Sequence, residues 1–265
     1  MIRTIRAMPT LLRVGFADAL AYRAELVVWL LSTNLALVMM AITTAVAREA
    51  PVGRFGQSQF VAYYLVTLVV RLLTGAYVVW EANMEIRQGT LAFRLLRPIH
   101  PLVHYAAENV AAMPLRAAIA LPIAGVLLLV AGGTHVTRDP LLWALFPVSV
   151  LGAWLITFLA LSVIAALAFW VDSAVSVAQV WFGLFTVLSG YILPLEIFPG
   201  WLSHAARFLP FRYVLAFPVE MLIGMTPRGQ ALVELGIQWL FVAGFALAAR
   251  ASWRAGLERY SAFGG

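Results

Sequence analysis

Long apolar stretches recur along this chain and leave few ways for it to fold. A helix needs about 20 mostly apolar residues to cross the hydrocarbon core of a bilayer, and six stretches approach or exceed that length with at most one charged residue each. They are residues 26–47, 60–79, 117–134, 141–171, 174–193 and 231–249. Because a helix satisfies its backbone hydrogen bonds internally, the pattern predicts an all-α, polytopic membrane protein. We expect six transmembrane helices in a single transmembrane domain covering residues 1–265.

The composition agrees with a lipid environment. Apolar residues make up 63% of the chain and charged residues 11%, whereas a soluble domain is about 45–50% apolar and about 25% charged. The net charge of +6 is carried by arginines that lie between apolar runs, which favours a membrane surface over nucleic acid. The chain contains no Lys, so it lacks a phosphate loop of the GxxxxGK[ST] type. The absence of Cys excludes disulfides, thiolate catalysis and Cys-ligated zinc.

The segments outside the spans predict the orientation and two further features. More arginines fall in the segments that are cytoplasmic if the N-terminus lies inside, so both termini are expected in the cytoplasm. Residues 1–24 are basic and amphipathic, which is typical of a helix lying at the membrane interface; a plain cytosolic extension is the alternative. Residues 80–116 form a charged cytoplasmic connection. Residues 194–228 are apolar, external and interrupted by prolines, which predicts short re-entrant helices; a seventh span is the alternative.

Residues that could carry chemistry are few. Ser189 precedes a glycine as in an intramembrane serine protease motif, but no His lies inside a span to act as its base. His100 and His104 have a helical i, i+4 spacing that two metal ligands could use, and Glu108 extends that face. Pro101 lies between the two histidines, so a solvated loop is the better interpretation. We therefore expect no catalytic site, no metal site and no cofactor bound by this chain.

Three residues inside the spans are candidates for a substrate path. Arg71 is a cation within an apolar stretch, and such residues usually face a partner or a water-filled cavity. A buried ion pair, or an arginine reaching toward the cytoplasmic interface, is the better explanation. Trp154 and Trp181 lie deep in their predicted spans and could line a path, although ordinary helix packing also accounts for them.

The most informative segment is WEANMEIRQGTLAFRLLRPIHP, residues 80–101. Glu81 and Glu85 form an i, i+4 pair, Gly89 is expected to break the helix, and Thr90 can cap the next turn. An apolar surface beside arginines is what docking into a groove of another protein needs; a helix lying passively on the membrane is the alternative. The expected surface consists of Leu91, Phe93, Leu95 and Leu96 beside Arg94 and Arg97, and Pro98 ends it.

This segment resembles the cytoplasmic loop of ABC-2-type permeases, the membrane subunits of ATP-binding-cassette exporters. The shared pattern is E-x3-G-T-L-x3-L-L-x-P, which begins at Glu85 and ends at Pro98. The stretches ADALAYRAELVVWLLS (17–32), LPLEIFPGWL and FLPFRYVLAFPVE are also similar to those of a bacterial subfamily. The resemblance covers nearly the whole chain and says little about the substrate.

The resemblance implies a set of functional roles. The loop would form a coupling helix that docks on an ATPase subunit, residues 1–24 would be the family's elbow helix, and residues 194–228 its re-entrant helices. Two ATPase subunits, which hold ATP and Mg²⁺, would join two permeases, identical or related, in a bacterial inner membrane and move a substrate outward. A stand-alone secondary transporter or channel, or a membrane-embedded lipid-modifying enzyme, is the alternative. The coupling candidates are Glu81, Glu85, Gly89, Thr90, Leu91 and Arg94.

Overall fold

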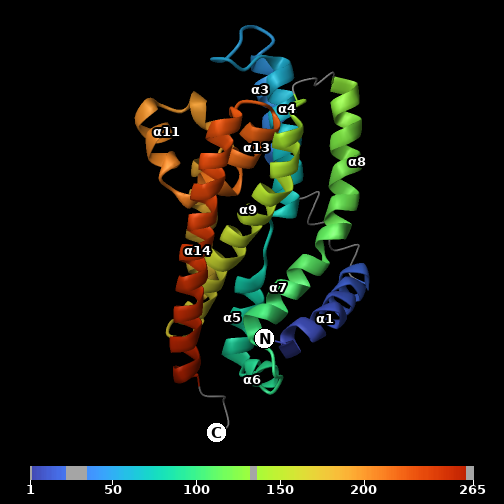
Figure 1. Ribbon diagram of the computed structural model, residues 1–265. Helices are drawn as coiled ribbons and strands as arrows, with labels where there is room; N and C mark the ends of the chain where they lie inside the picture. Colours follow the sequence, from blue (N-terminus) through green and yellow to red (C-terminus); the bar gives the residue numbers. More distant parts are fainter. Residues whose placement is uncertain (1, 22–34, 132–135, 261–265) are drawn as a thin grey trace.

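The computed structural model describes residues 2–21, 35–131 and 136–260, and within these residues the secondary structure is helical (Figure 1). The all-α prediction is therefore confirmed. The longer helices are α1 (Ile2–Ala21), α3 (Leu35–Val46), α4 (Gln57–Leu73), α5 (Val78–Gln88), α7 (Pro101–Ala111), α8 (Met113–Ala131), α9 (Pro140–Ala166), α10 (Ala174–Leu188) and α14 (Arg228–Arg259).

Four helical stretches of the described residues are long and apolar enough to cross a membrane. They are Gln57–Gln88, which joins α4 and α5, Pro101–Leu127, which joins α7 to most of α8, Pro140–Phe169 and Arg228–Arg259. Two shorter apolar helices, α3 and α10, correspond to the first and fifth predicted spans. Residues 22–34 of the first predicted span lie outside the described residues. The chain is thus a multi-pass membrane protein, and the count of six spans stays a prediction.

Helix α9 is the centre of the molecule. It packs against α14 along its length and also contacts α5 and α10. Its Gly152 allows a close approach, because a Cβ there would lie 2.9 Å from the side-chain carbon Cδ of Gln238 on α14. The Gln238 amide donates hydrogen bonds to the carbonyl oxygens of Ser149 and Tyr213, at 2.9 and 2.8 Å. A buried polar side chain therefore joins three elements at this crossing, as buried polar groups require.

The fifth predicted span is shorter than the sequence suggested. The sequence predicted a helix to residue 193, but α10 ends at Leu188. The cause is Gly190, whose φ of +85° takes the chain out of the helix. A Cβ there would lie 2.5 Å from the Tyr63 hydroxyl, and that hydroxyl donates a 2.7 Å hydrogen bond to the Gly190 carbonyl oxygen. Helix α4 thereby fixes the end of α10.

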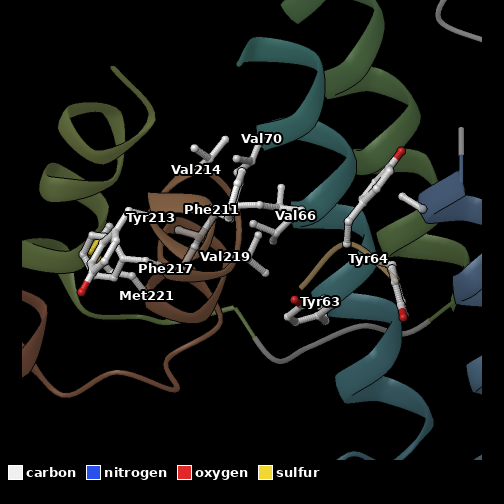
Figure 2. Packing of buried hydrophobic residues seen from close by; sticks show 14 of the residues in the cluster. Tyr63, Tyr64, Val66, Val70, Phe211, Tyr213, Val214, Phe217, Val219 and Met221 are labelled. Carbon is white, nitrogen blue, oxygen red and sulfur yellow. The ribbon is translucent and has the colours of Figure 1, made fainter. Parts of the chain in front are cut away.

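Residues 194–228 form four short helices. They are the 3₁₀ helix η2 (Leu195–Ile197), α11 (Gly200–Arg207), α12 (Pro210–Val214) and α13 (Ala216–Leu222). Prolines begin three of these helices, since Pro194 and Pro199 precede η2 and α11 and Pro210 is the first residue of α12. Figure 2 shows Val66 and Val70 of α4 facing Phe211 and Val219 of this segment. The segment is thus packed against the spans.

A buried ion cluster also fixes this segment. The Arg212 guanidinium donates to Glu220 at 2.9 Å and to Glu234 of α14 at 2.6 Å, and the three side chains are at most 12% exposed. Each buried charge therefore has a partner, without which its burial would be strongly unfavourable.

Residues 80–116 are largely helical. The sequence predicted a helix up to Gly89 and a further helical turn before Pro98, and the structure adds helix after Pro98. Helix α5 continues the direction of the second span after a break at residues 74–77, and α6 (Leu91–Leu95), α7 and the first turn of α8 follow. The predicted second span, which ran to residue 79 without interruption, is therefore wrong at its end. Gly75 lies at the break, where its carbonyl oxygen accepts a 2.8 Å hydrogen bond from Arg116 of α8. An arginine of a neighbouring helix thus occupies a backbone oxygen that the broken helix leaves free.

Candidate docking site for a partner protein

The turn between α5 and α6 begins the site. Helix α5 ends at Gly89, which adopts a φ of +75° that favours glycine, so the expected helix break is confirmed. Thr90 does not cap α6 through its side chain as expected. Its hydroxyl points back instead and donates a 3.5 Å hydrogen bond to the carbonyl oxygen of Glu85. This hydrogen bond joins the turn to the last part of α5.

An ionic network fastens α6 to its neighbours. The Arg94 Nε lies 2.8 Å from both carboxylate oxygens of Glu85, and the Arg94 Nη1 lies 3.0 Å from Glu108 of α7. The Tyr105 hydroxyl donates a 2.7 Å hydrogen bond to Glu85, and the Arg94 guanidinium lies 4.5 Å from the centre of the Tyr105 ring. Charge-assisted hydrogen bonds are the stronger ones, so the network holds α5, α6 and α7 together.

Burial and ion pairing shift the pKa of Arg94 in opposite directions. Burial by itself lowers the pKa of the guanidinium, but the hydrogen bonds to Glu85 and Glu108 outweigh burial and leave the pKa raised. The side chains of Arg94 and Glu85 are only 18% and 16% exposed. This pair therefore lies inside the site, where it holds the helices together, rather than on the surface that a partner would touch.

The end of α14 also reaches this turn. The Tyr260 hydroxyl donates a 2.8 Å hydrogen bond to the carbonyl oxygen of Gly89, and the Tyr260 ring packs edge-on against Phe169. The last span and the α5–α6 turn are therefore in direct contact, although they are 171 residues apart in the chain.

The exposed face of α6 is apolar. Phe93 is 70% exposed and Leu96, directly after the helix, is 83% exposed, with Leu95 partly exposed between them. Large apolar side chains that gather on a surface mark interaction sites. We call Phe93, Leu95 and Leu96 the docking face. Arg97 is exposed next to it.

The coupling candidates with large side chains face the interior of the site. Leu91 is fully buried, and Glu85 and Arg94 point inward into the network. Glu81 lies one turn before Glu85 and has a buried oxygen without a hydrogen-bond partner among the described residues. The side chains that reach outward are instead Phe93 and Leu96. The sequence placed both in the expected apolar surface, and it was wrong to place Leu91 there, because Leu91 is buried.

Among the described residues, the three candidates for a substrate path form no ring or ion-pair contact with one another. Trp154 is 4% exposed and stacks on Phe158 within α9. Trp181 packs against Phe211 of α12 at a centroid distance of 4.6 Å. The Arg71 guanidinium lies 5.2 Å from the ring centre of Phe185, and no carboxylate of the described residues forms an ion pair with it. The two tryptophans pack between helices, and a transport role for these residues stays a prediction.

The two histidines and Glu108 do not form a shared site. Glu108 is engaged by Arg94, and the Nδ1 of His100 accepts a 3.2 Å hydrogen bond from the Leu102 backbone as the N-cap of α7. His104 is buried. Over the described ranges, three or more His, Cys, Asp and Glu residues do not gather anywhere in an arrangement that could hold a metal ion.

The fold and the site together define a class of protein. The chain is an all-helical, multi-pass membrane protein that carries an exposed apolar docking face on a short helix at one end of the bundle. Its sequence matches the model of the ABC-2 family transporter proteins over residues 32–264. The chain belongs to this family, as its loop sequence indicated. Among curated proteins, none is significantly similar to it.

Proposed function

We propose that this chain is the membrane-spanning permease subunit of an ATP-binding-cassette exporter. Family membership supports a transport role, and the observation that carries the proposal is the docking face. A permease without its own phosphate loop needs an ATPase partner. Phe93 and Leu96 supply the apolar knob that a groove on such a partner would receive, with Arg97 at the rim. ATP and Mg²⁺ would bind to the partner, and this chain would bind no cofactor.

The same proposal places the molecule in the membrane. Figure 1 shows α6, the start of α1 and the end of α14 at one end of the bundle, which we assign to the cytoplasm in agreement with the arginine distribution. Helix α1 lies against α7, and Val14, Phe16 and Leu20 on α1 are exposed. These residues would face lipid if α1 is the elbow helix at the bilayer surface. Residues 194–228 would then lie at the outer side of a bacterial inner membrane as re-entrant helices.

The mechanism follows from these positions. Two copies of the ATPase would close on ATP and push on the docking face of each of two permeases, which are either identical or related. The network around Arg94 would pass this movement to α5 and α7, and the spans would alternate between two states. A ligand can shift such an equilibrium only through a difference in its contacts with the two states. The apolar spans suit a path for an amphiphile or lipid-like substrate better than they suit a wide carbohydrate channel.

Copurification with matched variants tests the proposal. The tagged chain is purified in mild detergent from its own host and its partners are identified by mass spectrometry. We expect an ATPase subunit with the wild type and its loss from Phe93→Ser/Leu96→Ser. The control is Trp201→Ser/Phe208→Ser, which removes two equally exposed apolar side chains, 74% and 77%, from the segment of residues 194–228. This control should retain the ATPase.

Two outcomes would count against the proposal. If no ATPase accompanies the wild type in several detergents, the chain works without one. If both double variants retain the ATPase equally while they elute as folded protein, the partner binds elsewhere and the docking face has another use.

A further inference from the structure

A groove lies between α7, α9 and α14, on a part of the molecule that the proposed function does not use. Its volume is about 780 Å³, within the range of about 300–1,000 Å³ that is usual for ligand sites. Most of its lining is apolar and comes from all three helices. The apolar lining residues are Leu102, Val103, Leu159, Ala246, Ala249 and Leu257.

The groove is apolar along Ala246 and Ala249, and both cations lie further along α14, where Leu257 and Glu258 also line it. Along α14, Ala246 and Ala249 line the first part, and Arg250 and Arg254 follow one turn apart on the same face. Leu159 of α9 completes the apolar part. Because the helix rises 1.5 Å per residue, Ala246 and Arg254 are separated by about 12 Å along the axis. The small alanines leave room beside them, and the two guanidinium groups lie further along the groove.

The two arginines are available to a ligand. Arg250 is exposed and forms no ion pair with any residue of the described ranges. Arg254 pairs with Glu258, another lining residue, but the distance is 3.4 Å and the two side chains are 83% and 69% exposed. Such exposed pairs contribute little and are readily exchanged. Burial lowers the pKa of His100, the remaining polar lining residue, so it is neutral at pH 7 and the positive charge comes from the arginines.

The groove lies where the last apolar stretch ends. The apolar part of the last span ends at Ala249, so Arg250 and Arg254 fall where the hydrocarbon core gives way to head groups. A phosphate group accepts two parallel hydrogen bonds from a guanidinium, and basic pockets between membrane helices recognise acidic lipid head groups. A free anion would leave the apolar part of the groove unused, whereas a phospholipid fills both parts.

We propose that this groove binds one anionic phospholipid of the leaflet at the α6 end. Its phosphate lies between Arg250 and Arg254, and one acyl chain runs along Ala249, Ala246 and Leu159. The proposal rests on the chain being a membrane protein and not on its having an ATPase partner. The lipid would tie the start of α7 to the last span, and therefore stabilise the helix that carries Glu108 of the docking network.

Lipid binding to the purified full chain tests the proposal. Native mass spectrometry counts bound phosphatidylglycerol and phosphatidylcholine in mixed micelles, and thermal unfolding is followed in parallel. We expect phosphatidylglycerol to bind and to raise the unfolding temperature, since a ligand that binds only the native state stabilises it. Arg250→Gln/Arg254→Gln should weaken binding by about tenfold or more, as expected for loss of charge-assisted hydrogen bonds.

Matched variants distinguish lipid binding in this groove from nonspecific binding through charge or hydrophobicity. Arg97→Gln/Arg259→Gln removes two exposed arginines at the same end, and Arg259 lies on the opposite side of α14 from Arg250, two and a half turns further on. This control should bind as the wild type does. Ala246→Trp should block the apolar part of the groove, whereas Leu247→Trp, at a position 71% exposed beside the groove, should not.

Four results would overturn the proposal. Equal binding of the two lipids, or unchanged binding by the Arg250/Arg254 variant, would show that the arginines do not select an anionic head group. Equal protection by glycerol phosphate would show that the site takes a free anion. A dimer mass that disappears with Ala246→Trp would show that a second copy of the chain covers the groove. None of these results depends on whether an ATPase copurifies.

Discussion

Gly256 of α14 allows the last span to pack against a ring, and replacing it by Ala tests that packing directly. A Cβ at this position would lie 2.0 Å from Cδ2 and 2.5 Å from Cε2 of Phe169. Carbon atoms pack at about 3.5–4.0 Å, so the ring would have to move by more than about 1 Å. Its surroundings resist this movement, because Trp253 and Tyr260 meet the ring edge-on at centroid distances of 5.7 and 5.9 Å.

The magnitude follows from comparing two glycines of the same helix. Overpacking a filled site costs about 1–3 kcal/mol, whereas Ala in place of Gly within a helix gains about 1 kcal/mol. At Gly244, also on α14, a Cβ would have no neighbouring atom within 4 Å. Gly244→Ala should therefore gain helix propensity without a steric cost. The two variants should therefore differ in unfolding free energy by about 1–3 kcal/mol. For a chain of this size that corresponds to about 2–12 °C in unfolding temperature.

The assay is thermal unfolding of both variants and the wild type in one detergent, followed by intrinsic tryptophan fluorescence. Gly256→Ala should unfold below the wild type, or level with it where the gain in helix propensity offsets the clash, and always below Gly244→Ala. If Gly256→Ala is as stable as Gly244→Ala, then α14 does not pack on Phe169 in this way. The last span would then have to reach the α5–α6 turn through other contacts.

The partly buried network of Arg94 and the buried cluster of Arg212 give further predictions. Glu85→Gln leaves Glu108 as the remaining carboxylate partner of Arg94, so we expect the free energy of unfolding to fall by about 1–3 kcal/mol. The measurement is the unfolding temperature, and an unchanged temperature would contradict the network. Arg212→Met leaves two buried glutamates without their cation, and we expect a loss of about 3–5 kcal/mol. Neutralising both glutamates in the same chain should recover much of that loss, and a variant that stays equally unstable would show that the arginine acts through packing alone.

Much of the fold could be predicted because it depends on local pattern. The apolar stretches indicated the helices, Gly89 indicated the break after α5, and the prolines marked the starts of short helices after residue 193. The end of α10 could not be predicted, because it depends on the hydroxyl of Tyr63 reaching Gly190 from a helix far away in the chain. The break before α5 likewise involves Arg116, a residue of another helix.

The candidate site shows the same division between local pattern and tertiary contact. The sequence indicated that residues 80–101 form a docking element, but it could not tell inward from outward residues on a helix as short as α6. Arg94 and Glu85 have the composition of a surface ion pair, yet the ring of Tyr105 and the carboxylate of Glu108 draw them inside. The apolar Phe93 is left outside because Leu91 already fills the interior position.

The attachments of α6 indicate how a push on the docking face would travel. The helix is joined to α5 and α7 through Arg94, and the turn before it is joined to the end of α14 through Tyr260. These contacts are directional hydrogen bonds, so the elements they join should move together. The buried apolar residues form one large cluster that includes α3, α4 and α13, and another that includes α5, α7 and Trp253.

The break at residues 74–77 lies between α4, whose buried residues belong to the first cluster, and α5, whose buried residues belong to the second. The second cluster also contains residues of α9, α10 and α14, so a change in the angle of α5 at this break would alter its packing on those helices. A push on α6 would therefore reach α5 and α7 together with the parts of α9, α10 and α14 that share this cluster, while Arg116 holds the Gly75 carbonyl oxygen at the break.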